Sequence, residues 1–144
     1  MRTTIAFIFS LLILAGCTEK KEEKLLPITN ENISGVWKAS RFVSTLPGLT
    51  EEQKKGGELE FLSSVYTLRA DHSFNLTSDA YAAGANGRWE LDPNTYLLRM
   101  SYEMGGERGV EEFTVEALKA DTLTLRIDIK DMNAFIQLKL SRSK

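Results

Sequence analysis

The chain offers few side chains that could perform catalytic chemistry. Its one histidine, His72, occupies a place where a hairpin turn would usually carry Asp-Gly, and histidine tolerates a positive φ better than most residues. The acidic residues include adjacent pairs such as Glu111-Glu112, which would point to opposite faces of a strand and so cannot act together as an acid–base pair. The sequence has no Gly-x-Ser-x-Gly, phosphate loop, cysteine cluster or His-x-x-x-His. We therefore expect no catalytic residue, no metal site, no cofactor and no enzymatic activity.

The single cysteine, Cys17, ends an apolar segment. Residues 5–16 are apolar or small except for Ser10, and they follow a positive charge at Arg2. Twelve residues of helix rise roughly 18 Å, which is short of the roughly 30 Å of hydrocarbon that a spanning helix must cross. This arrangement is typical of a secretory signal peptide rather than of a membrane span.

The four residues Leu14-Ala15-Gly16-Cys17 resemble the bacterial lipobox. The resemblance implies that the signal is cleaved before Cys17 and that a diacylglycerol is attached to its thiol. We therefore expect a lipoprotein signal peptide at residues 1–16. A lipidated flexible tether would follow at residues 17–32, because its charged start cannot bury enough surface to offset the entropy of ordering. The folded domain would occupy residues 33–144.

These features predict that the membrane is a partner, through the lipid on Cys17, and that the protein works in the cell envelope. The residues Lys21-Glu22-Glu23 resemble a short signal that directs lipoproteins of Bacteroidota to the surface of the outer membrane. Whether the protein faces the periplasm or the outside stays open. The formal net charge of −2 gives no basic footprint for nucleic acid.

Eight short segments with a period of two predict an all-β fold. Turn residues divide them, among them Asp92-Pro93-Asn94 and Gly105-Gly106. Strands joined by short links make an antiparallel up-and-down meander, and closing it into an eight-stranded barrel removes the exposed edges. The expected strands are residues 34–43, 65–69, 73–78, 87–91, 95–102, 109–118, 122–130 and 133–141.

Residues 50–64, after the first strand, have a helical pattern instead. Thr50 is a suitable N-cap, and Leu59 and Leu62 follow at helical spacing. Gly56-Gly57 should interrupt the helix. We expect one or two short helices that cover an end of the barrel.

Two Gly-x-Trp motifs, Gly35-Val36-Trp37 and Gly87-Arg88-Trp89, accompany this order of elements. Together they resemble the small lipocalin-like lipoproteins of Bacteroidota, over roughly residues 33–141. The resemblance implies a calycin-like barrel in which Trp37 closes the floor against an arginine near the last strand, with Arg142 as the candidate partner. The chain is shorter than typical lipocalins, and their other sequence motifs are not evident.

An eight-stranded barrel is just wide enough to be filled by its side chains or to hold one small apolar ligand. Two functions follow: binding of a small hydrophobic ligand, or an interaction module that has a filled core and binds an envelope protein or glycan through loops at residues 80–86 and 103–109. Asp121-Thr122-Leu123 resembles an O-glycosylation site of Bacteroidota at Thr122, although a hairpin turn explains it equally well. The residues expected to line the ligand site or the core are Trp37, Tyr66, Phe74, Trp89, Tyr96, Met100, Tyr102 and Phe113.

Overall fold

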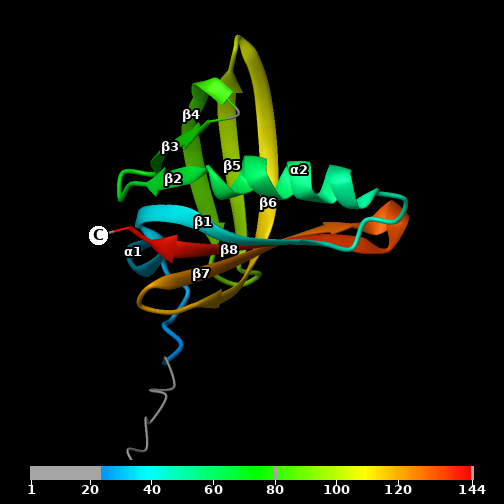
Figure 1. The fold of residues 1–144 in the computed structure, drawn as a ribbon. Helices are drawn as coiled ribbons and strands as arrows, with labels where there is room; N and C mark the ends of the chain where they lie inside the picture. Colours follow the sequence, from blue (N-terminus) through cyan, green and yellow to red (C-terminus); the bar gives the residue numbers. More distant parts are fainter. Residues whose placement is uncertain (1–23, 80, 144) are drawn as a thin grey trace, which may run out of the picture.

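A computed structural model describes residues 24–79 and 81–143. The eight strands form a closed barrel in the order of the chain, and each strand pairs antiparallel with its neighbours (Figure 1). The predicted eight-stranded up-and-down barrel, with a helix after the first strand, is thus confirmed. The strands are β1 (Gly35–Ser44), β2 (Val65–Leu68), β3 (Ser73–Ser78), β4 (Tyr81–Asp92), β5 (Leu97–Met104), β6 (Glu107–Leu118), β7 (Thr122–Ile129) and β8 (Ala134–Arg142).

The barrel is tight at one end and splayed at the other. β1 pairs with β2 only from Gly35 to Lys38, whereas it pairs with β8 as far as Ser44. β6 meets β7 only over Thr114–Leu118. Figure 1 accordingly shows β1, β7 and β8 running across the direction of β3–β6.

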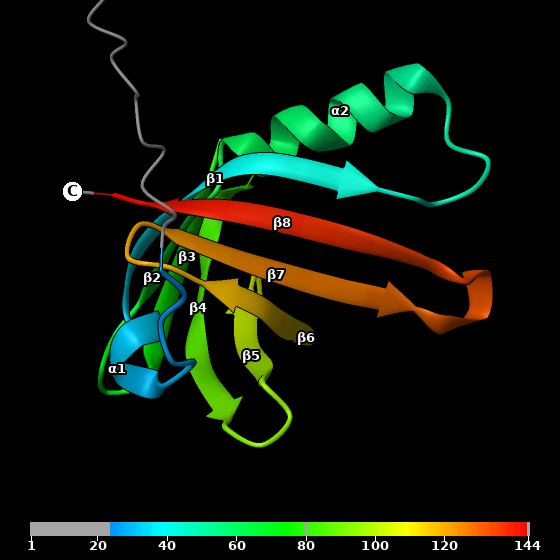
Figure 2. The ribbon, with the colours of Figure 1, turned by 90° about the horizontal axis from the view of Figure 1, so that it is seen from below.

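The helix α2 (Glu51–Leu62) lies alongside β1 in both views (Figures 1 and 2). Its start is a capping box, in which Thr50 Oγ1 accepts from the Gln53 amide at 3.2 Å and Gln53 Oε1 accepts from the Thr50 amide at 2.9 Å. The prediction that Gly56-Gly57 interrupts the helix was wrong, since α2 runs through both glycines. The capping box at the start of α2 and the stacking of Phe61 on Phe42 (4.8 Å) near its end offset the low helix propensity of the two glycines.

The ordered domain begins before residue 33, and the prediction of a flexible tether as far as residue 32 was wrong. The Leu26 amide donates to the Leu118 carbonyl at 2.8 Å, and Leu26 and Ile28 pack against the core. A short helix, α1 (Asn30–Ile33), then buries Ile33 completely. The apolar residues Leu26, Ile28 and Ile33 of this segment pack against the core at the tight end of the barrel. Residues 17–23 lie outside the described part of the chain.

Both loops proposed for partner binding are largely strand. β4 begins at Tyr81, and β5 and β6 extend to Met104 and Glu107 around the turn at Gly105-Gly106. Both glycines of that turn have a positive φ, as the tight hairpin requires. These segments are therefore the ends of β-hairpins rather than irregular loops.

Large apolar side chains fill the tight half of the barrel. Trp37, Trp89 and Phe113 are the largest that are fully buried, and leucines of β5–β8 surround them. A pocket on the inner face lies toward the splayed end. The other side chains less than 2% exposed are Ile33, Leu98, Val115, Leu118, Leu123, Leu125, Leu138 and Leu140.

Candidate functional site: barrel floor, open-end pocket and outer groove

Trp37 and Arg142 meet at the tight end. The Arg142 guanidinium carbon lies 4.4 Å from the centroid of the indole ring, and the Trp37 Nε1–H donates to the Ile33 carbonyl at 2.8 Å. Arg142 Nη2 donates to the Asn32 carbonyl at 2.8 Å and Nη1 to the Ser34 carbonyl at 3.3 Å. Trp37 is fully buried. The first strand, the last strand and the end of α1 are thus joined around one ring, which closes the floor.

The second tryptophan supports the same end and accounts for the histidine. Trp89 Nε1–H donates to the Arg69 carbonyl at 3.0 Å, and the His72 ring stacks on the indole at 4.8 Å. His72 has a φ of 66°, as expected for its place in the turn before β3. It is therefore a packing and turn residue.

Most of the predicted interior residues do point inward. Tyr66, Phe74, Met100 and Phe113 are buried with the two tryptophans, and Tyr102 is half-buried. Tyr96 was assigned to the interior wrongly. Its side chain is 46% exposed, and its φ of 57° places it in the turn before β5 rather than in a strand.

A pocket of about 90 Å³, which we call the open-end pocket, lies on the inner face of β2–β6, toward the splayed end. Its wall is mostly apolar. Tyr66, Tyr102 and Glu111 supply its polar atoms. The remaining lining residues are Phe74, Leu76, Ala85, Met100 and Met104.

Glu111 was missed as a site residue. It continues inward the alternation of Phe113 and Val115 on β6, so the period of two could have identified it. Its Oε1 accepts from the Tyr102 hydroxyl at 3.3 Å. Although the residue as a whole is exposed, desolvation of its carboxyl raises its pKa, and the hydrogen bond from Tyr102 opposes this in part. Desolvation and the nearby Glu111 carboxylate raise the pKa of Tyr102.

Gly109 keeps Tyr102 in this position. The two residues face one another across β5 and β6, and a Cβ on Gly109 would lie 2.5 Å from Cζ of the Tyr102 ring. The phenol lies over the glycine and thereby reaches Glu111. A side chain at residue 109 would push the ring out of this place.

We expect Glu111→Gln to be more stable than the unmodified protein at neutral pH and of similar stability in acid. A carboxyl whose pKa is raised on folding makes the folded protein less stable as the pH rises above the pKa of the unfolded state, about 4.5. The reason is that the folded state disfavours the charged form. Glutamine removes this loss and can still accept from Tyr102. Urea unfolding at pH 4 and pH 7.5 measures the difference, and Glu107→Gln, at an exposed residue of the same hairpin, is the control. Equal stability of the Glu111 variant and the unmodified protein at both values would contradict the assignment.

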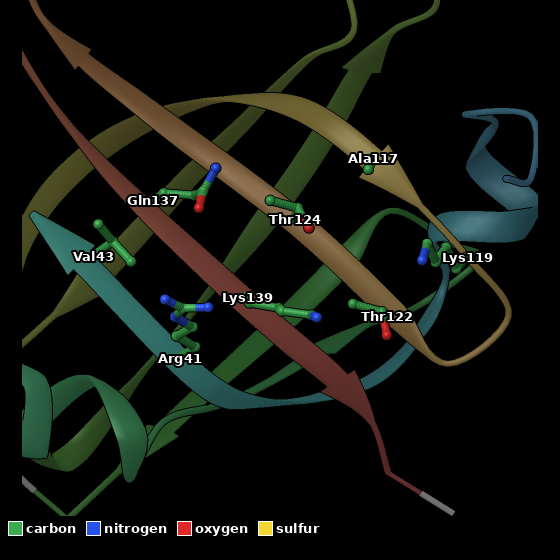
Figure 3. Close-up of a pocket in the computed structure, with 8 residues that line it drawn as sticks. All are labelled: Arg41, Val43, Ala117, Lys119, Thr122, Thr124, Gln137 and Lys139. Carbon is green, nitrogen blue, oxygen red and sulfur yellow. The ribbon is translucent and has the colours of Figure 1, made fainter. Parts of the chain in front are cut away.

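A second hollow of about 290 Å³ lies on the outer face, across β1, β8, β7 and the end of β6 (Figure 3). Its lining alternates along each strand with buried leucines such as Leu123, Leu125 and Leu138, which places it outside the barrel. Thr122 lines one end, and its hydroxyl donates to Asp121 Oδ1 at 3.0 Å. We call this hollow the outer groove, and its lining residues are Arg41, Val43, Ala117, Lys119, Thr122, Thr124, Gln137 and Lys139.

The described residues contain no group of three His, Cys, Asp or Glu side chains placed to hold a metal ion. Within the same part of the chain, no helix is both long and apolar enough to cross a bilayer. Cys17 lies outside the described residues. Comparison of the chain with protein families, curated proteins and solved structures gave no match. The fold defines the class, an eight-stranded up-and-down β-barrel.

Proposed function

We propose that the protein is a lipid-anchored, lipocalin-like barrel of the cell envelope, held at the outer membrane by Cys17, that binds a small hydrophobic group. The observation that carries the binding proposal is the open-end pocket: an apolar wall with one carboxyl and two phenols, on the inner face of the barrel. Ligand pockets usually combine an apolar lining with a few placed polar groups.

The volume of the pocket limits how much of a ligand it can hold. About 90 Å³ is several times what one water needs, but it is well below the roughly 300 Å³ at which pockets for drug-sized molecules begin. Trp37, Trp89 and Phe113 block any deeper entry. The ligand therefore inserts only an end, such as the terminus of an alkyl chain or a single ring, and its remainder stays in the splayed mouth.

The polar atoms of the pocket select the chemistry of that ligand. Glu111 and Tyr102 share one hydrogen bond, and the carboxyl is desolvated. An amine or hydroxyl on the ligand, near its inserted end, would donate a hydrogen bond to the Glu111 carboxylate and offset its desolvation. A carboxylate on the ligand would instead be repelled by Glu111. We expect the protein to prefer an alkyl amine or alcohol to a fatty acid of the same length.

Titration calorimetry with octylamine, octanol and octanoate tests this order. Met104→Trp places a larger side chain at the pocket and should weaken octylamine binding about tenfold or more, roughly 1.4 kcal/mol. Met132→Trp, the same change at an exposed residue of the helical turn η1 (Lys130–Met132), should leave binding unchanged. Native mass spectrometry of protein purified from the cells that make it should show a bound small molecule. Binding that is absent, or equal in both variants, would contradict the proposal.

A further inference from the structure

The outer groove gathers cationic side chains in a chain that is acidic as a whole. Arg41, Lys119 and Lys139 line it, none of its eight lining residues is acidic, and the formal net charge of the chain is −2. It lies on the opposite face of the barrel wall from the open-end pocket. We propose that the outer groove is a second binding site, for a phosphate group carried as a monoester or diester.

The strongest support is a pair of like charges. Arg41 of β1 and Lys139 of β8 are directly opposite one another in the register, just after the irregularity at residues 39–41 (Figure 3). Neither forms an ion pair with an acidic side chain among the residues that the structure describes. Like charges directly opposite across two strands destabilise a sheet. An anion between them turns this repulsion into two attractions.

The floor of the groove leaves room for that anion. Thr124 of β7 lies opposite Lys139 on one side and Ala117 of β6 on the other, so short side chains follow the two cations across the sheet. Thr124 adds a hydroxyl that can donate to a phosphate oxygen.

The acidic residues that adjoin groove residues in the sequence, Glu116 beside Ala117 and Asp121 beside Thr122, already have hydrogen-bond partners. Glu116 accepts from Gln137 Nε2 at 2.6 Å and from Arg126 Nη1 at 3.4 Å, and Asp121 accepts from the Thr122 hydroxyl. Neither carboxylate forms an ion pair with Arg41 or Lys139 in the described part of the chain.

Phosphate fits this set of donors better than a smaller anion does. The planar guanidinium of Arg41 can donate two parallel hydrogen bonds to two phosphate oxygens, and the ammonium of Lys139 acts as a compact point charge beside it. A volume of about 290 Å³ also exceeds a bare anion, so it admits part of the group that the phosphate is attached to.

The groove is next to the place where the chain arrives from its amino terminus. Leu26 is hydrogen-bonded to Leu118, which lies between the groove residues Ala117 and Lys119. The phosphate could therefore belong to a lipid headgroup of the membrane or to a soluble phosphate ester. Both present the same chemistry, and the experiment separates them.

The test uses the full chain with Cys17→Ser, so that no lipid anchor contributes to binding. Calorimetry with glycerol 3-phosphate at fixed ionic strength measures the soluble ester. Flotation with phosphatidylcholine vesicles, with and without phosphatidylglycerol, measures the headgroup. We expect Lys139→Glu to weaken binding in the positive arm at least tenfold, and Lys130→Glu, an identical change of charge outside the groove, to have little effect.

The melting temperature of the Lys139→Glu variant shows whether a loss of binding is due to misfolding. It replaces the like-charged pair with an opposite-charged pair facing Arg41, so the melting temperature without phosphate should stay the same or rise. Binding of the ester alone assigns the site to soluble phosphates, and binding of the anionic vesicles assigns it to headgroups. No binding in either arm, or equal losses in the two variants, would overturn the proposal.

Discussion

Trp37→Ala should lower the free energy of unfolding by about 3–5 kcal/mol, the usual cost of removing a buried aromatic side chain. The ring is fully buried, so alanine leaves a cavity in the tight end of the barrel. The Ile33 carbonyl also loses the indole N–H, and the Arg142 guanidinium loses the ring beneath it. A loss of this size is a large part of the total stability of a small domain. Urea unfolding followed by circular dichroism measures it.

Tyr96→Ala is the matched control, because sequence alone placed both aromatic residues in the interior. Tyr96 is largely exposed in a turn, so its replacement should change the free energy of unfolding by no more than about 0.5 kcal/mol. Similar losses in the two variants would show that the barrel floor does not have the packing described.

Cys17→Ala should abolish incorporation of a radioactive fatty acid into the protein and release it from the membrane fraction. The proposal follows from the lipobox resemblance, in which the thiol is the group that receives the lipid. Thr18→Ala, at the neighbouring residue, should keep both the label and the membrane association. Persistent labelling of the alanine variant at residue 17 would refute the anchor.

The structure limits the distance between the proposed anchor and the barrel. Leu26 is fixed to Leu118, so nine residue steps separate Cys17 from the barrel, and even a fully extended chain of this length spans only about 30 Å. The predicted tether to residue 32 would have been nearly twice as long. The proposed lipid on Cys17 would therefore hold the barrel close to the bilayer.

The strands were predictable because each buries one face. Leu123 and Leu125 alternate with threonines in β7, for example, and the predicted start of that strand is the observed one. The start of β4 was missed because its first half is rich in alanine and glycine, residues with low strand propensity. Pairing with β3 and β5 makes it a strand nonetheless.

Other errors came from contacts between residues that are distant in the sequence. Stacking of Phe61 on Phe42 helps to keep α2 continuous through its glycines, and Leu118 holds the segment that was expected to be free. Neither partner can be identified from local composition. The outer groove was missed for the same reason, since Arg41 and Lys139 become neighbours only when the last strand pairs with the first.

The closure of the barrel by Arg142 has a consequence for how the protein is made. This residue bonds carbonyls 108 and 110 positions earlier in the chain, those of Ser34 and Asn32. A chain that emerges from the ribosome amino terminus first cannot complete this barrel floor until Arg142 has been made and has reached Asn32 and Ser34. Contacts of such long range slow folding and leave unpaired strands exposed in the interval.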